Sequence, residues 1–330
     1  MVKGAVLFKN VPAVIAGLFA ASILNFILPA SAARGADKLN VVTTVAPLTN
    51  IVKNIGGDRI NLHGIVPEGT DSHTFEPAPS DIQYLAAADL LIFNGLHLET
   101  PTEKLALANK KKGAKVLKLG DNTVSQKEWV FDFSFPESEG SPNPHLWLNV
   151  AYAMRYAELV RDALGSLDPQ NKEYYRKRGA EYLSRLKLLD EAAAKTMATI
   201  PAKNRKLLTY HDSWAYFCPR YGCKVIGAVQ PSSFSQPSPK EVARLIDQLR
   251  AEQVPAIFGS EVFPSKVLNQ IGKEAGVRFI STLRDDDLPG PVDAPEHSYI
   301  GMTLENLRTM ATSLGGRADP LKDIDPGDIP

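Results

Sequence analysis

The sequence predicts an α/β protein of two lobes, each with a four-stranded, mainly parallel sheet flanked by helices, joined by one long linking helix. First, from Leu39 onward short apolar or β-branched runs alternate with segments of helical period, which is typical of βα units around a parallel sheet. Second, this alternation occurs twice along the chain. Third, residues 171–199, which lie between the two sets, contain no proline and a single glycine, and their apolar residues recur at three- and four-residue steps. We therefore expect an N-terminal lobe at 33–170, a linking helix at 171–200 and a C-terminal lobe at 201–316.

Residues 1–32 have the pattern of a signal peptide. Lys3 and Lys9 precede an apolar stretch at 11–28, and residues 30–32 are the small residues that cleavage requires. The alternative is a membrane anchor, because the apolar stretch is almost long enough to span a bilayer, but its proline and the small residues after it favour cleavage. No cysteine follows the stretch, so we expect a periplasmic protein without a lipid anchor.

The N-terminal lobe contains four apolar or β-branched runs separated by helical segments. Two glycines end the first helix, Ser80 and Asp81 open the second, and Gly113 follows the third. The predicted strands are 39–45, 59–65, 90–94 and 115–118, and the predicted helices are 47–55, 80–88 and 102–111.

The C-terminal lobe repeats the pattern, with its clearest helix after Ser238. Ser238 can cap the helix, Pro239 suits the first helical position, and Glu241 stands three residues after the cap. The predicted strands are 206–210, 224–229, 255–258 and 278–282.

We expect the linking helix to be rigid and the end of the chain to be flexible. At a rise of 1.5 Å per residue, the linking helix is a stiff strut of roughly 40 Å, so we expect only small hinge motion between the lobes. Residues 317–330 are rich in proline and acidic residues and have few apolar ones, so we expect a flexible tail without fixed structure.

Charge and cysteine content exclude several classes of protein. The 37 basic side chains balance 37 acidic ones and form no long basic run, so a nucleic-acid partner is not expected. Two cysteines cannot build a disulfide-dense scaffold or a cysteine-based zinc site. Cys218 and Cys223 are expected to form a disulfide in an oxidising compartment, the alternative being two buried thiols. Any metal would therefore be held by nitrogen and oxygen.

Three of the six histidines follow predicted strands at positions that favour ligand binding. His73 follows strand 59–65, His145 follows the last strand of the first lobe, and His211 follows strand 206–210 directly. Three aspartates, 285–287, stand in the equivalent place after strand 278–282. Ligands of open α/β sheets bind outside the carboxyl ends of the strands, so we expect these groups to face one cleft between the lobes.

Three motifs around these histidines resemble a known family. They are Asp71-Ser72-His73-Thr74-Phe75-Glu76-Pro77, Asn143-Pro144-His145-Leu146-Trp147 and His211-Asp212-Ser213-Trp214-Ala215-Tyr216-Phe217. In this order and spacing they resemble the substrate-binding proteins of zinc and manganese ABC transporters, over about residues 39–315. The resemblance implies two lobes joined by a rigid helix, metal ligands at His73, His145, His211 and Asp286, and delivery of the metal to an inner-membrane ABC permease. Asp285 or Asp287 could take the place of Asp286.

The ligand set implied by the resemblance favours Zn(II) as the transported ion. Three imidazoles and one carboxylate suit zinc, whereas Mn(II) prefers more oxygen. Family members that resemble manganese binders have a glutamate where this chain has His211, so manganese is the less expected cargo. The resemblance also implies a monomer, and a periplasmic metallochaperone is a possible second partner.

The remaining polar residues are expected to have lesser roles. We expect His63 to be packed in its strand, His297 to lie on the surface, and His97 to lie near the cleft rim, where a weak metal contact is the less expected role. The acidic loop 121–143 has no histidine; we expect a solvated loop, with a mobile lid that guides the cation or docks a partner as the alternative. The carboxylates expected to orient metal-bound imidazoles are Glu76, Asp212 and Glu261.

Two further functions compete with metal transport. A zinc hydrolase would need an open coordination position and a general base, but Asp286 would close the tetrahedron and the chain has no HExxH arrangement. An adhesin with incidental metal binding would be insensitive to metal removal. We therefore expect a binding protein and not an enzyme.

Overall fold

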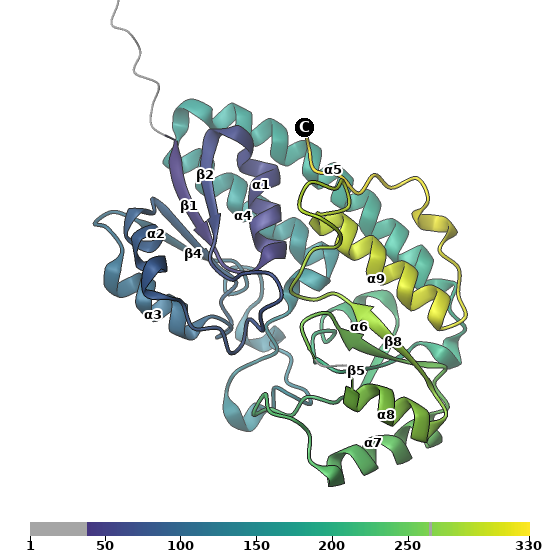
Figure 1. Cartoon of the computed structure of the whole chain (residues 1–330). Helices are drawn as coiled ribbons and strands as arrows, with labels where there is room; N and C mark the ends of the chain where they lie inside the picture. Colours follow the sequence, from purple (N-terminus) through teal and green to yellow (C-terminus); the bar gives the residue numbers. More distant parts are fainter. Residues whose placement is uncertain (1–37, 264–265) are drawn as a thin grey trace, which may run out of the picture. The chain divides into compact units, whose positions relative to one another are not determined.

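The computed structural model describes residues 38–263 and 266–330, so the predicted signal peptide at 1–32 lies outside the described residues. The first sheet contains four parallel strands in the order β2-β1-β3-β4 (Figure 1). The strands are β1 (Leu39–Thr43), β2 (Ile60–Gly64), β3 (Leu90–Phe93) and β4 (Lys115–Lys118).

The second sheet repeats this topology with the order β6-β5-β7-β8, again with parallel pairs. The strands are β5 (Lys206–Thr209), β6 (Lys224–Ala228), β7 (Ala256–Ser260) and β8 (Arg278–Leu283). The predicted fold class is therefore confirmed, and each of the eight predicted strands is present with its ends shifted by at most two residues. In each sheet the second strand lies on one side of the first strand, and the third and fourth strands lie on the other side. This change in winding direction leaves a crevice at the carboxyl ends of the strands.

Helices flank both sheets. They are α1 (Ala46–Gly56), α2 (Ile82–Ala87), α3 (Thr100–Asn109), α4 (Val150–Leu167), α5 (Lys172–Ala198), α6 (Phe217–Tyr221), α7 (Pro239–Glu252), α8 (Lys266–Ala275) and α9 (Tyr299–Ser313). The predicted cap of α7 is present: the Glu241 backbone N–H donates to Ser238 Oγ, and the Ser238 N–H donates to the Glu241 carboxylate. In the described part of the chain, no helix combines the length and apolar character needed to cross a bilayer.

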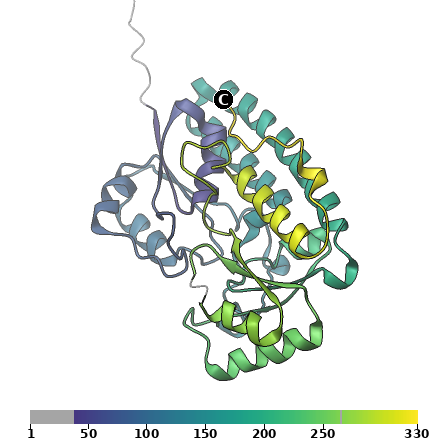
Figure 2. The same cartoon turned by 45° about the vertical axis from the view of Figure 1, so that its right-hand side comes forward.

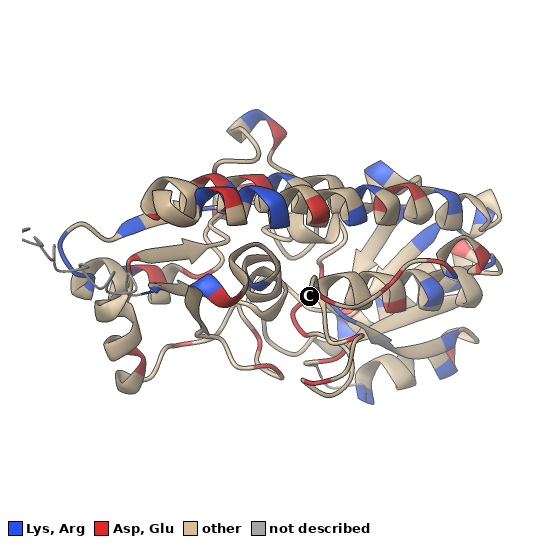
Figure 3. Cartoon of the chain, turned by 90° about the horizontal axis from the view of Figure 1, so that it is seen from above, with Lys and Arg blue, Asp and Glu red and all other residues tan. Residues whose placement is uncertain are grey.

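Helix α5 is the predicted linking helix and has 27 residues. It packs against α4, α1 and α9, and Figures 1 and 2 both show α9 lying along it. Its buried face includes Tyr175, Tyr182, Leu186, Leu189 and Ala193, whose spacing of three, four or seven residues keeps them on one side. Basic and acidic side chains are interspersed along the outer helices rather than separated by sign (Figure 3). The helix therefore joins the two lobes through a continuous apolar contact.

The predicted disulfide is present between Cys218 and Cys223. Cys218 lies in α6, and Cys223 directly precedes β6. The bond therefore closes a short loop between α6 and β6 within the C-terminal lobe.

The predicted flexible tail at 317–330 is wrong. This segment contains a short 3₁₀ turn at Asp319–Leu321, and the side chains of Leu321 and Ile329 are buried. Arg178 on α5 donates hydrogen bonds to the backbone carbonyls of Ile329 and Pro330, at 3.0 and 2.5 Å. The tail is ordered by contacts with residues far away in the sequence, which its local composition does not reveal.

We expect Asp328→Ala to destabilise the fold by about 1–3 kcal/mol. Asp328 Oδ1 accepts hydrogen bonds from the buried amides of Asn50 and Asn54, at 2.9 and 2.8 Å, and its removal leaves both amides without this acceptor. Urea unfolding of the metal-free protein measures the change. Asp325→Ala is the matched control, because Asp325 is exposed and pairs with Arg185 at the surface, so its removal should cost about 0.5 kcal/mol or less. Equal effects of the two substitutions would contradict a packed tail.

Candidate metal centre

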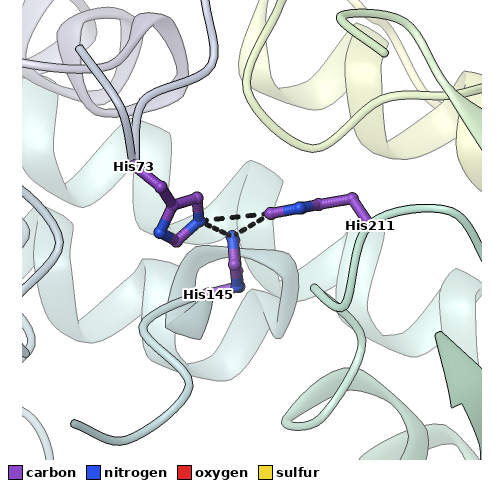
Figure 4. Close-up of side chains that lie close together, drawn as sticks. All are labelled: His73, His145 and His211. Atoms are coloured by element: carbon purple, nitrogen blue, oxygen red, sulfur yellow. Dashed lines mark hydrogen bonds between the residues drawn. The ribbon is translucent and has the colours of Figure 1, made fainter. Parts of the chain in front are cut away.

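Three imidazoles meet where strands of both lobes end (Figure 4). His73 lies in the loop after β2, His145 lies at the end of the long loop after β4, and His211 follows β5. The Nε2 atom of His73 is 3.2 Å from Nε2 of His145 and 3.2 Å from Nε2 of His211, and the latter two Nε2 atoms are 2.9 Å apart. His145 and His211 are buried, whereas His73 is partly exposed. The structure thus brings together the three histidines that the sequence placed at strand ends.

Two side-chain amides fix the proton positions of the buried imidazoles. His145 Nδ1 is 2.7 Å from Asn143 Oδ1, and His211 Nδ1 is 2.6 Å from Gln230 Oε1. Because each amide oxygen can only accept, each Nδ1 donates its hydrogen, and the Nε2 atom of the neutral ring carries a lone pair. Two lone pairs then face each other at 2.9 Å, an arrangement that is favourable only with a cation between them.

The surroundings give the three imidazoles different proton affinities. Burial lowers the pKa of both His73 and His145 well below the ordinary value, and neighbouring imidazoles lower it further. Burial also acts to lower the pKa of His211, but the carboxylates of Asp285 and Asp286 outweigh it, and the net pKa is raised. Of the three imidazoles, His211, which feels the charges of Asp285 and Asp286, therefore accepts a proton most readily.

The aspartates after β8 approach the histidines from the C-terminal lobe. Asp286 is buried; its Oδ2 accepts from Ser72 Oγ at 2.8 Å, while its Oδ1 has no hydrogen-bond partner among the described residues. Burial and then the charge of Asp285 raise the pKa of Asp286 to about 7. Asp286 lies outside the group formed by the three histidines, whose ligand nitrogens are all within 4.8 Å of one another.

The other two aspartates have hydrogen-bond partners for their carboxylates. Asp285 Oδ1 accepts from Ser260 Oγ, and Asp287 Oδ2 accepts from the backbone N–H of Gly69 in the other lobe. Asp286 is thus the member of the triplet with a buried oxygen left over.

Of the three carboxylates that were predicted to orient the imidazoles, two have other partners and the third is exposed. Glu261 Oε1 accepts from the backbone N–H groups of all three aspartates in the loop after β8, so it holds that loop and no histidine. Asp212 accepts from the backbone N–H of Ser134, and Glu76 is exposed. The orienting groups are instead the amides Asn143 and Gln230. A sequence signal existed for both, since Asn143 belongs to the motif around His145 and Gln230 directly follows a predicted strand.

The loop 121–143 bridges the lobes and is not simply solvated. Ser134 Oγ donates to the carbonyl of Gln230, and the Asn143 amide donates to the carbonyl of Asp212 and to the carboxylate of Asp132. Burial and the neighbouring Asp212 carboxylate raise the pKa of Asp132 to about 9. The segment therefore contributes to the wall of the metal centre.

The remaining histidines lie outside the cluster. The ring of His63 stacks on Tyr84 at a centroid distance of 3.7 Å. His297 lies 3.4 Å from a Glu68 carboxylate oxygen, and its Nδ1 is 3.2 Å from the carbonyl of Gly290. His97 is exposed and contacts the edge of Trp129.

We expect Gln230→Leu to weaken metal binding by about 10- to 100-fold. The leucine is close in size to glutamine but cannot accept the hydrogen from His211 Nδ1, so the ring loses the partner that fixes its orientation and tautomer. Competition with a chromogenic chelator measures the affinity. Gln270→Leu on the exposed face of α8 is the control, and equal affinity of the two variants would exclude an orienting role for Gln230.

Two parallel α/β lobes, a stiff connecting helix and convergent imidazoles from both lobes define a substrate-binding protein for a metal ion. A family model described as ZnuA, the periplasmic component A of a zinc-uptake complex, matches residues 41–313. The chain belongs to this family.

Relatives with different metals in their names are similarly close. The manganese ABC transporter substrate-binding lipoprotein PsaA of Streptococcus pneumoniae is 30% identical over 284 residues, covering 86% of this chain and 91% of the relative. The iron-binding protein YfeA of Yersinia pestis is 30% identical over 280 residues, covering 85% and 88%. The structure of the periplasmic zinc-binding protein TroA from Treponema pallidum superposes with a TM-score of 0.76 at 28% identity, covering 85% of this chain and all of TroA.

These relationships establish the general function. The chain is a substrate-binding protein of a metal ABC transporter. Proteins of this family act outside the cytoplasm together with an ABC permease, and they are transport proteins rather than enzymes. Several relatives are named as lipoproteins, which differs from the expected absence of a lipid anchor. That expectation stays a prediction, because the N-terminal segment lies outside the described residues.

Proposed function

We propose that this protein binds Zn(II) between its lobes as cargo, with His73, His145, His211 and Asp286 as ligands, and delivers it to an ABC permease. The observation that carries the proposal is the convergence of three imidazole Nε2 atoms within 2.9–3.2 Å of one another, two of them with lone pairs fixed by amide oxygens.

The spacing of the three nitrogens suits a small metal ion. With Zn–N bonds of about 2.0–2.1 Å, the donor atoms of a regular tetrahedron lie about 3.3–3.4 Å apart. The observed separations of 2.9–3.2 Å need only small outward shifts of the rings. Three imidazoles also favour a borderline cation such as zinc over a hard one.

Asp286 is the fourth ligand in this proposal. Its buried Oδ1 has no hydrogen-bond partner in the described part of the chain, and a buried carboxylate oxygen in that state is costly unless a cation or a proton satisfies it. Asp286 lies outside the 4.8 Å histidine cluster, so its loop would have to approach the three imidazoles to complete the coordination.

Manganese is the second candidate cargo. The acidic loop after β8 brings the carboxylates of Asp285 and Asp286 close enough to His211 to raise its pKa, and oxygen ligands favour Mn(II). Asp285 and Asp287 accept hydrogen bonds from Ser260 and Gly69, and the buried oxygen without a partner in the described part of the chain belongs to Asp286, so one carboxylate beside three imidazoles favours zinc.

Metal analysis and competitive titration of the purified mature protein test the proposal. We expect one equivalent of tightly held zinc and displacement of Mn(II) by Zn(II) at equal concentrations. Preferential retention of manganese would mean that the coordination sphere contains more oxygen than three imidazoles and one carboxylate. Absence of any stoichiometric metal would refute the site itself.

In the proposed function the protein is a monomer that releases the ion to a permease. A metallochaperone that first supplies the ion is a further partner in this proposal. Transfer of zinc from the loaded protein into vesicles that contain the permease would test the delivery step directly.

A further inference from the structure

A cavity of about 150 Å³ opens beside the histidine cluster and reaches His73. Its lining includes His97, Glu139, Ser141, Phe135 and Phe234 in addition to His73. His97 and Glu139 are exposed, Phe135 is buried, and His73 is the partly exposed member of the histidine cluster. The cavity therefore runs from a polar rim to the one histidine of the cluster that is not fully buried.

We propose that this cavity is the path by which the cation enters, and that His97 and Glu139 form an outer docking point for a divalent cation at its rim. The proposal rests on the proposed function, because it assigns a path to the same cargo. An imidazole and a carboxylate are the ligand types that bind a borderline divalent ion, and two ligands on an exposed rim hold it weakly enough to release it inward.

Two phenylalanines of the cavity lining pack against the histidine cluster. The ring of Phe234 stacks on the ring of His73 with a centroid distance of 4.7 Å and an interplanar angle of 14°. Phe135 contacts His73 and His145 at centroid distances of 5.4 and 5.8 Å, and its edge meets Phe234 at 5.8 Å. Because a cation is attracted to the faces of such rings, the two phenylalanines lower the free-energy cost of moving the cation from water into the cavity.

The backbone that presents His97 is strained. Gly95, Leu96 and His97 have φ angles of 80°, 51° and 68°, so three successive residues adopt the left-handed conformation, which leucine and histidine rarely do. The buried carboxylate of Glu99 holds this turn by accepting hydrogen bonds from the backbone N–H groups of Asn94 and Gly95, at 2.7 and 3.1 Å. Such backbone strain lowers the stability of the fold and is found mostly at functional sites. Its position here at the rim of the cavity therefore supports a functional role for the rim.

An outer docking point makes a specific kinetic prediction. A group that contacts the cation only during passage changes the association and release rates by the same factor and leaves the Kd unchanged, because it touches neither the free nor the fully bound state. A permanent ligand instead changes the Kd. The two roles are therefore separated by measuring both rates and the equilibrium.

The test uses the double variant His97→Asn/Glu139→Gln of the full mature chain, with zinc sulfate as the probe. Asparagine is chosen because it tolerates the left-handed backbone at position 97. Association is followed by rapid mixing of metal-free protein and zinc in competition with a fluorescent chelator, and release by mixing the zinc-loaded protein with excess chelator. His63→Asn/Glu137→Gln is the matched control, with the same chemical changes at exposed or stacked positions outside the cavity.

We expect both rates to fall about tenfold in the double variant, with a Kd within twofold of the unchanged protein and no change in the control. Unchanged rates would overturn the proposal, as would a loss of affinity with an unchanged association rate. Failure of the proposed function is seen separately, since the unchanged protein would then hold no stoichiometric zinc in the equilibrium titration.

Discussion

Replacement of His211 by alanine is expected to weaken zinc binding by at least about 100-fold while the protein stays folded. Loss of a residue that only orients a ligand already costs 10- to 100-fold, so loss of a ligand should cost more. The Nε2 atom of His211 lies 2.9 Å from Nε2 of His145, and the charges of Asp285 and Asp286 raise the pKa of His211. Isothermal titration in competition with a chelator of known affinity measures the loss.

The control for this variant is His297→Ala, which removes a histidine that lies outside the cluster. Its zinc affinity should equal that of the unchanged protein, and both variants should keep the far-UV circular dichroism of the native fold. A third variant, His211→Glu, tests metal choice: a carboxylate in place of the imidazole should raise the affinity for Mn(II) relative to Zn(II). Full zinc affinity in His211→Ala would refute the ligand assignment.

The strands could be predicted from the sequence because their signal is local. A parallel strand buried on both faces is a short apolar run, and β3, with the sequence LLIF, is buried throughout. The start of α7 could also be predicted, because the capping residues Ser238, Pro239 and Glu241 are neighbours in the sequence. Helix α4 was not predicted, although its buried residues Val150, Ala153, Tyr156, Ala157, Val160 and Leu164 recur at helical spacing.

The features that the sequence could not reveal depend on contacts between distant residues. The tail was predicted to be flexible from its composition, but Asp328 is held by amides on α1, 278 and 274 residues away. The three histidines could be placed near one another because strand ends meet at one edge of a sheet. The choice of Asn143 and Gln230 over nearby carboxylates as their partners is set by side-chain directions, which a one-dimensional pattern does not contain.

Acidification is expected to release the metal, with His211 and Asp286 as the first groups to compete for it. A metal ligand must be deprotonated, so each proton that the metal displaces lowers the affinity about tenfold per pH unit below the pKa of that group. The pKa of Asp286 is raised to about 7 and that of His211 is raised above the ordinary imidazole value, so in the metal-free protein both groups take up protons at a higher pH than an unperturbed carboxyl or imidazole group would. His73 and His145 have lowered pKa values and stay available as ligands to lower pH.

Between pH 7 and pH 5 the zinc affinity should therefore fall by about 100- to 10,000-fold, corresponding to one to two displaced protons. Titration in two buffers with different ionisation enthalpies counts the protons released at each pH. Asp286→Asn should release one proton fewer and show a shallower pH dependence, whereas Asp319→Asn at the surface should match the unchanged protein. Tight zinc retention at pH 4 would be incompatible with three imidazole ligands, and an unchanged proton count in Asp286→Asn would remove Asp286 from the coordination sphere and leave the histidines as its only supported members.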